Sequence, residues 1–221
     1  MIIRHHVSEE LLYEYAAGRL GETWSVAIAT HLALCPECRM RERLFDSVGG
    51  NILDASAPAT MAQGSLDACM ALIEANGSQE PAHSQRTTET PARPVFPEPL
   101  RGYAGGDLDT VPWSKVGGGV RQKIISAGTD ATASCRLLYI PPGQAVPEHG
   151  HRGLELTLVL AGSFSDGDAT FARGDLEIAD EEVEHTPIAG MDGPCICLAV
   201  TDAPLRFKSW LPRLAQRFIK I

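Results

Sequence analysis

Three potential metal ligands lie close together in the first third of the chain, within the stretch HLALCPEC. His31, Cys35 and Cys38 are separated by four and by three residues. On an α-helix these offsets return to one face, so the three side chains can converge. Zinc in structural sites takes four tetrahedral sulfur or nitrogen ligands. The spacing therefore predicts a structural zinc site in a helical segment, with a fourth ligand supplied from elsewhere in the chain.

The start of the chain can provide that fourth ligand. His5 and His6 are both present there, and the chemistry of an imidazole does not distinguish between them. A ligand from this position would join the first helix to the two that follow. The alternatives are a dithiol redox pair or two buried thiols. Because the N-terminus lacks the apolar run of a signal peptide, we expect a cytoplasmic protein, in which a disulfide framework is unusual.

Apolar residues recur at helical spacing through most of the first 76 residues. The pattern predicts helices over residues 8–21, 22–35, 36–54 and 65–75. Ile28 and Leu32 are spaced as a buried stripe, and so are Leu44 and Val48. A domain of this size forms only a small hydrophobic core, so bound zinc would add stability that the bundle lacks.

The composition changes after the last of these helices. Residues 77–99 are rich in Pro, Ser, Thr and Gln, which is typical of a linker. Beyond residue 100, short strands alternate with Gly, Pro and Asp, which predicts a β-sandwich or barrel. We therefore expect a multidomain protein with an all-α zinc-binding helical bundle (1–76), a linker (77–99) and an all-β domain with a C-terminal tail (100–221). The expected strands cover residues 120–126, 134–142, 154–162, 169–179, 184–189 and 195–202.

A second group of potential ligands lies in the β-rich part, within EHGHRGLE. His149 and His151 alternate along a strand and so share a face, and Glu155 begins the next strand. His185 lies on a candidate partner strand. Three imidazoles and one carboxylate suit Zn, Fe, Mn or Ni, and we expect a second divalent metal here, with zinc as the first candidate. The alternative is a cavity that histidines line without binding a metal.

These ligands follow a known spacing. The segment from Gly143 to Gly162 resembles the first cupin motif at its full length, and Gly174 with His185 resembles a looser second motif. Asp180 and Glu182 stand where cupins usually carry Pro and Gly, which puts the shape of that turn in doubt but leaves the ligand in place. The resemblance implies that the all-β domain is a cupin barrel.

The first ligand group also resembles a known domain. His6, followed by His31-x-x-x-Cys35-x-x-Cys38, is similar to the zinc-binding anti-sigma domain over residues 1–75. The resemblance selects His6 as the fourth ligand. A domain of this kind followed by a cupin resembles the ChrR family of anti-sigma factors over nearly the whole chain.

The family resemblance implies a function. It implies that the chain binds a group-IV (extracytoplasmic-function) sigma factor as a heterodimer and blocks its association with RNA polymerase. The N-terminal domain would suffice for inhibition, and the cupin would be needed for release under singlet oxygen or related oxidative stress. The alternative is a metal-dependent cupin enzyme, a dioxygenase or isomerase, with an accessory zinc domain. We expect the regulator and not the enzyme.

Charge and the remaining motifs limit other functions. The net charge is −9, and residues 1–75 carry 5 basic and 10 acidic side chains, so we expect no direct nucleic-acid partner. No apolar run has the length of a bilayer crossing, so we expect no membrane partner. Residues 205–221 carry five basic residues and no acid, and we expect a solvated helical tail there. Cys195 and Cys197 share one face of a strand, where either a buried apolar role or a sensing role is open.

Overall fold

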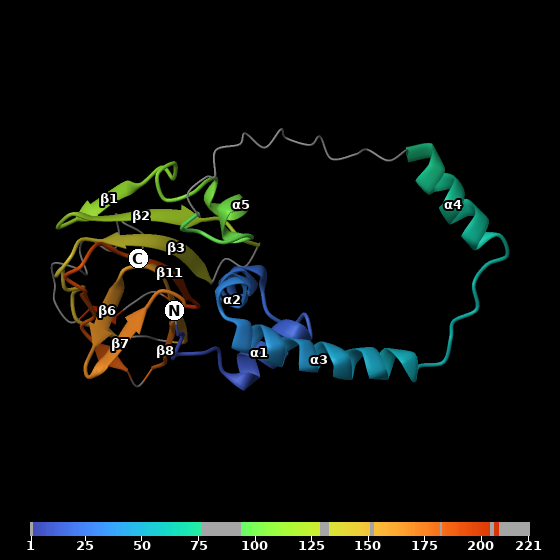
Figure 1. Ribbon diagram of the computed structural model, residues 1–221, viewed down its shortest axis with the longest axis horizontal. Helices are drawn as coiled ribbons and strands as arrows, with labels where there is room; N and C mark the ends of the chain where they lie inside the picture. The colour runs from blue at the N-terminus through green and yellow to red at the C-terminus, as the bar shows by residue number, and fades with distance from the viewer. Residues whose placement is uncertain are drawn as a thin grey trace. The chain divides into compact units, whose positions relative to one another are not determined.

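Helices occupy the first part of the chain, as the sequence predicts (Figure 1). The computed structural model describes residues 2–76, 94–128, 133–150, 153–181, 183–203 and 206–207. The oxygen of Ser8 accepts a hydrogen bond from the Leu11 backbone N–H at 3.3 Å and so caps the first helix. The helices are α1 (Glu9–Ala16), α2 (Glu22–Leu34), α3 (Pro36–Asp54), α4 (Ser65–Asn76) and the short α5 (Leu100–Ala104).

The helix that carries the three clustered ligands is broken between them. Cys35 has an extended backbone (φ −103°, ψ 103°), and it separates the end of α2 from the start of α3. The cause is Pro36, because proline disfavours helical backbone at the preceding residue and suits the first position of a new helix. His31 and Cys38 therefore belong to two helices, as the predicted helices over 22–35 and 36–54 imply, and the three ligands do not share one continuous helical face.

The second part of the chain is β-rich, which confirms the predicted fold class. A six-stranded sheet has the order β1-β2-β3-β11-β5-β8, and two three-stranded sheets have the orders β10-β6-β7 and β12-β4-β9. All the pairings are antiparallel. The strands are β1 (Ser114–Gly117), β2 (Val120–Ile125), β3 (Ser134–Ile140), β4 (His149–Gly150), β5 (Glu155–Ala161), β6 (Ser163–Asp166), β7 (Ala169–Ala172), β8 (Leu176–Ala179), β9 (Glu184–His185), β10 (Ile188–Ala189), β11 (Cys195–Thr201) and β12 (Arg206–Phe207).

Two neighbouring strands of the large sheet, β5 and β11, are buried on both faces. In β11, Ile196 and Leu198 belong to one hydrophobic cluster, whereas Cys195 and Cys197 belong to another. The period of two along a strand explains this division. The first cluster also contains Ile28 of α2, so one face of the sheet packs against the helices and the other faces the interior of the barrel. The two cysteines share a face, as predicted, with their sulfur atoms 3.3 Å apart.

The chain divides into two compact units. One consists of Met1–Ser47 with Pro94–Ile221, and the other of Val48–Arg93. In the first unit the Thr23 hydroxyl of α2 donates a hydrogen bond to the carbonyl oxygen of Ala127, at 2.8 Å in a buried position, so α2 is fixed directly to the β-rich part. The domain boundaries at residues 76 and 100 stay a prediction.

The apolar stripe of α3 is not part of a core. Leu44 is 63% exposed and Val48 is 58% exposed, although their spacing predicts burial. By contrast Ile28 and Leu32 of α2 are buried as predicted. Spacing on a helix identifies an apolar face but not what covers it.

Candidate metal centres

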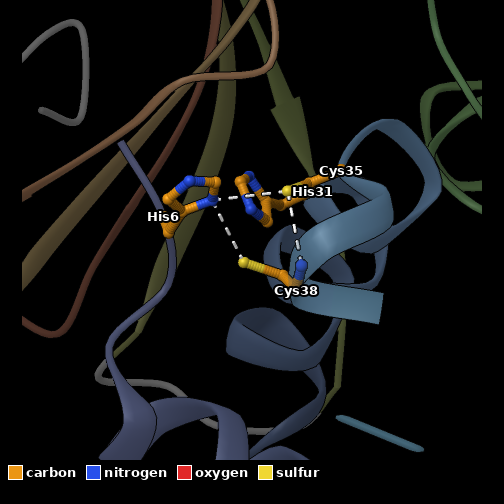
Figure 2. A group of neighbouring side chains, drawn as sticks. All are labelled: His6, His31, Cys35 and Cys38. Carbon is orange, nitrogen blue, oxygen red and sulfur yellow. Dashed lines mark hydrogen bonds between the residues drawn. The ribbon is translucent and has the colours of Figure 1, made fainter. Parts of the chain in front are cut away.

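Four side chains converge at the junction of α2 and α3 (Figure 2). His6 comes from the N-terminal segment, His31 from the last turn of α2, Cys35 from the break, and Cys38 from the first turn of α3. One potential ligand atom from each lies within 4.8 Å of all the others. His6 Nδ1 is 3.4 Å from the sulfur atoms of both Cys35 and Cys38.

These separations fit a tetrahedral zinc ion. With Zn–N of about 2.0 Å and Zn–S of about 2.3 Å, the edge from nitrogen to sulfur is about 3.5 Å. The other ring nitrogen of His6, Nε2, lies 3.4 Å from a carboxylate oxygen of Glu37. A carboxylate behind a metal-bound histidine fixes its tautomer and orientation. His6 therefore presents Nδ1 to the sulfur atoms in the way that a metal ligand requires.

His31 supports the same interpretation. Both of its ring nitrogens are buried, and neither has a hydrogen-bond partner among the residues that the structure describes. Burial and the neighbouring His6 lower the pKa of His31 to about 4, against the opposing effects of the Gly174 backbone and the Asp175 charge. The imidazole is therefore neutral at pH 7, which is the form that binds a metal. A buried, neutral and unpartnered imidazole costs free energy, and a bound metal would remove that cost.

The thiol of Cys38, unlike the imidazole of His31, must lose a proton before it can bind a metal. Burial and the neighbouring Cys35 raise its pKa to about 11, against the Val7 backbone and the charge of Arg41. The thiol is therefore protonated at pH 7 without a metal. Because a metal binds the thiolate, metal binding at this centre releases a proton.

The barrel holds a second cluster of potential ligands. Asp166 of β6, Glu177 of β8 and His185 of β9 each offer an atom within 4.8 Å of the others. The Nε2 atom of His149 in β4 lies 3.1 Å from the Nε2 atom of His185. The pairing of β4 with β9 places these two histidines directly opposite each other.

The outer nitrogens of the two histidines are occupied by hydrogen-bond acceptors. His149 Nδ1 lies 2.8 Å from the carbonyl oxygen of Pro147, and His185 Nδ1 lies 2.9 Å from a carboxylate oxygen of Asp166. Since carbonyl and carboxylate oxygens accept, both Nδ1 atoms donate. The Nε2 atoms of the two rings face each other at 3.1 Å. A divalent cation would be held by these two nitrogens, and Asp166 would support the ligating ring.

Glu177 is the most perturbed group of this cluster. Burial raises its pKa to about 8, with further contributions from Asp166 and Glu155. The carboxyl of Glu177 is therefore mostly protonated at pH 7 in the metal-free barrel, and a bound cation would favour its charged form.

The structure places the predicted ligands differently in the two halves. His6, His31, Cys35 and Cys38 lie together. In the barrel, His149 and His185 lie in direct contact. Glu155 is buried and accepts a hydrogen bond from the Thr157 hydroxyl at 2.9 Å, outside the Asp166–Glu177–His185 group. His151 lies outside the described residues.

Sequence reasoning missed two members of the barrel cluster. Asp166 is part of SFSDGD, which is typical of a turn, and Glu177 is the lone acid of a strand that is otherwise apolar. An acid between the apolar residues of a strand is a usable signal, because such a side chain requires a partner inside the protein if the fold buries it.

The chain is similar to known proteins both in its β-rich part and over its full length. Residues 103–204 match the family described as the ChrR cupin-like domain. Over all 221 residues the chain is 53% identical to the anti-sigma-E factor ChrR of Cereibacter sphaeroides, covering 100% of both proteins. The chain belongs to the ChrR family of anti-sigma factors. This membership confirms the expectation of a regulator and not an enzyme.

A solved structure extends the comparison to three dimensions. The crystal structure of Rhodobacter sphaeroides SigE in complex with the anti-sigma ChrR contains a chain that matches with a TM-score of 0.78 and 49% identity. The match covers 91% of this ChrR-family chain and 100% of that one. Within the part of the chain that the structure describes, none of the helices combines the length and apolar character that a bilayer crossing requires.

Proposed function

We propose that this protein binds a group-IV sigma factor as a heterodimer and prevents its association with RNA polymerase. The observation that carries the proposal is the 53% identity to an anti-sigma-E factor over the full length of both proteins. A ChrR chain that is 49% identical to this protein was crystallised in complex with SigE. Because sigma factors and RNA polymerase act in the cytoplasm, we place the protein there. Its acidic charge of −9 fits a protein partner better than direct contact with DNA.

The exposed face of α3 is the part of the surface that suits a sigma factor. Met40, Leu44, Val48 and Ile52 repeat every four residues, with exposed fractions of 61%, 63%, 58% and 66%. Four large apolar side chains in one row on a helix form a surface that a partner helix can bury.

In this proposal the N-terminal metal is zinc and serves as a scaffold. His6, His31, Cys35 and Cys38 would fill its four coordination positions, which leaves no position for a substrate. The zinc would hold the N-terminal segment, α2 and α3 together, and so fix the direction in which α3 presents its apolar face. A structural zinc contributes on the order of 10 kcal/mol to folding in small domains.

The proposed role of the cupin is release of the sigma factor under singlet oxygen or related oxidative stress. A divalent metal, zinc in the first place, would be held by His149 and His185, with Glu155 and His151 as further expected ligands. The close thiols of Cys195 and Cys197 and the imidazoles are oxidisable groups in the same barrel. Changing Glu155 or His185 to Ala tests this role, because unchanged release under singlet oxygen would exclude the metal site from sensing.

Co-purification tests sigma binding. The full chain, co-expressed with group-IV sigma factors of its own organism, should form a one-to-one complex with one of them. Leu44→Glu should disrupt the complex, because it places a charge in the apolar row of α3. The matched control is Met191→Glu, which changes another exposed apolar side chain (79%) in the β-rich part. A complex that survives Leu44→Glu and Val48→Glu together would exclude the α3 face.

The scaffold role has its own test. Cys35→Ser should abolish both metal binding and sigma binding, whereas Cys69→Ser, at an exposed cysteine of α4, should change neither. If the Cys35→Ser protein binds its sigma factor with unchanged affinity, zinc is not the scaffold.

A further inference from the structure

The N-terminal segment lies along the edge of the large sheet. In Figure 1 the start of the chain reaches the barrel beside β7 and β8. The strand β8 is the last strand of the six-stranded sheet, and its Leu176 backbone N–H donates to the carbonyl oxygen of His5 at 3.2 Å. An edge strand offers unpaired backbone groups, and the N-terminal segment uses one of them.

One buried carboxylate holds this segment in place. Asp175, directly before β8, is 3% exposed. One of its oxygens accepts from the backbone N–H groups of Arg4, at 2.6 Å, and His5, at 2.9 Å. The other oxygen accepts from the Ala172 N–H at 2.8 Å, which fixes the carboxylate to its own turn. The His5 ring lies 4.3 Å from the ring of Phe171. Hydrogen bonds to a carboxylate are among the stronger ones in proteins.

The next residue along the chain is a ligand of the N-terminal cluster. His31, Cys35 and Cys38 lie within eight residues of one another, but His6 is 25 positions before His31. Bringing such a distant ligand to the metal costs loop-closure entropy, and chain termini are usually poorly ordered unless they are tied down. Asp175 reduces this cost, because it fixes the two residues directly before His6.

We propose that Asp175 is a positioning residue: through it, the cupin holds the chain segment that carries His6. By holding this segment, Asp175 slows the loss of metal from the N-terminal centre. The inference rests on the metal centre of the proposed function. Glu177 of the barrel cluster, the second residue of β8, lies two residues after Asp175 in the chain. The strand β8 therefore joins the two candidate centres: its start holds the segment of one, and its second residue belongs to the other.

Release of Co²⁺ from the full chain tests the proposal. Cobalt bound by cysteine gives a thiolate charge-transfer absorption, whereas the barrel cluster of Asp166, Glu177 and His185 contains no sulfur ligand. After addition of excess EDTA, the Asp175→Ala protein should lose this absorption about tenfold faster than the wild type, or more, which corresponds to about 1.4 kcal/mol. The Asp192→Ala control, at an exposed acid of the cupin, should release Co²⁺ at the wild-type rate.

A second pair of variants leaves the cupin unchanged. His5→Pro removes the N–H that donates to Asp175, whereas His5→Ala removes the ring and keeps the N–H. His5→Pro should accelerate the release of Co²⁺ several-fold more than His5→Ala. If Asp175→Ala does not fold, this comparison still tests whether the hydrogen bonds to Asp175 retain the metal. Equal release from these two variants, or a wild-type rate in a folded Asp175→Ala protein, would overturn the proposal. If the wild type shows no thiolate absorption with Co²⁺, the N-terminal centre itself is refuted, and the inference with it.

Discussion

Glu177 should make the stability of the metal-free protein depend on pH. Burial raises the pKa of this carboxyl from 4.5 to about 8, with Asp166 and Glu155 acting in the same direction. Because the pKa is higher in the folded than in the unfolded state, the stabilising contribution is complete below pH 4.5 and is lost as the pH rises through about 8. The rise corresponds to at most about 5 kcal/mol.

The test compares three metal-free proteins. We expect the free energy of unfolding of the wild type to fall by a few kcal/mol between pH 5 and pH 9, measured by urea unfolding with near-ultraviolet circular dichroism. Glu177→Gln cannot ionise and should lose most of this dependence, whereas Glu181→Gln, at an exposed position, should retain it. If Glu177→Gln and the wild type show the same pH dependence, the carboxyl is not buried in the way that the structure describes, and the argument for a cation in the barrel fails.

Three further predictions concern the two metal centres and the hydrogen bond between Thr23 of α2 and Ala127. The affinity of the N-terminal centre for Zn²⁺ should rise at least about tenfold per pH unit between pH 6 and 8, because the thiol of Cys38, with a pKa of about 11, must lose its proton. Competition with a calibrated chelator measures the affinity, and an affinity that does not change with pH would contradict the prediction. Asp166→Asn should weaken metal binding in the barrel by about 10–100-fold, because it removes the carboxylate that lies behind His185. Dialysis against graded zinc buffers, followed by metal analysis, measures this affinity. Thr23→Val should lower the free energy of unfolding by about 1–3 kcal/mol, since it leaves the buried carbonyl of Ala127 without its donor; urea unfolding measures the loss, and no loss would show that this contact does not fix α2.

The sequence predicts correctly which side chains lie together where the ligands or thiols are close in the chain. The alternation in β11 predicts that Cys195 and Cys197 share a face, and their sulfur atoms are 3.3 Å apart. The spacing of His31, Cys35 and Cys38 predicts their convergence, which holds even though Pro36 breaks the helix between them. Local periodicity is informative because it depends only on backbone geometry.

The remaining features depend on contacts that no local pattern encodes. Leu44 and Val48 have the spacing of a core face but are exposed, because burial depends on which other element covers a helix. Asp166 and Glu177 lie on strands of two different sheets, β6 and β8, and come together only in the folded barrel. Asp175 resembles an ordinary turn residue until the fold brings the N-terminal segment against it. Choosing His6 over His5 also required the family resemblance, and the structure shows why the two differ: His6 turns to the sulfur atoms, whereas His5 contacts Asp175 and Phe171.

Transcription by purified RNA polymerase with the group-IV sigma factor of the same organism tests the central claim most directly. With zinc bound, the full chain should abolish transcription from a promoter of that sigma factor at a ratio of about one to one, and the Leu44→Glu protein should not. Transcription that continues unchanged in the presence of excess zinc-loaded wild-type protein would contradict the proposed function.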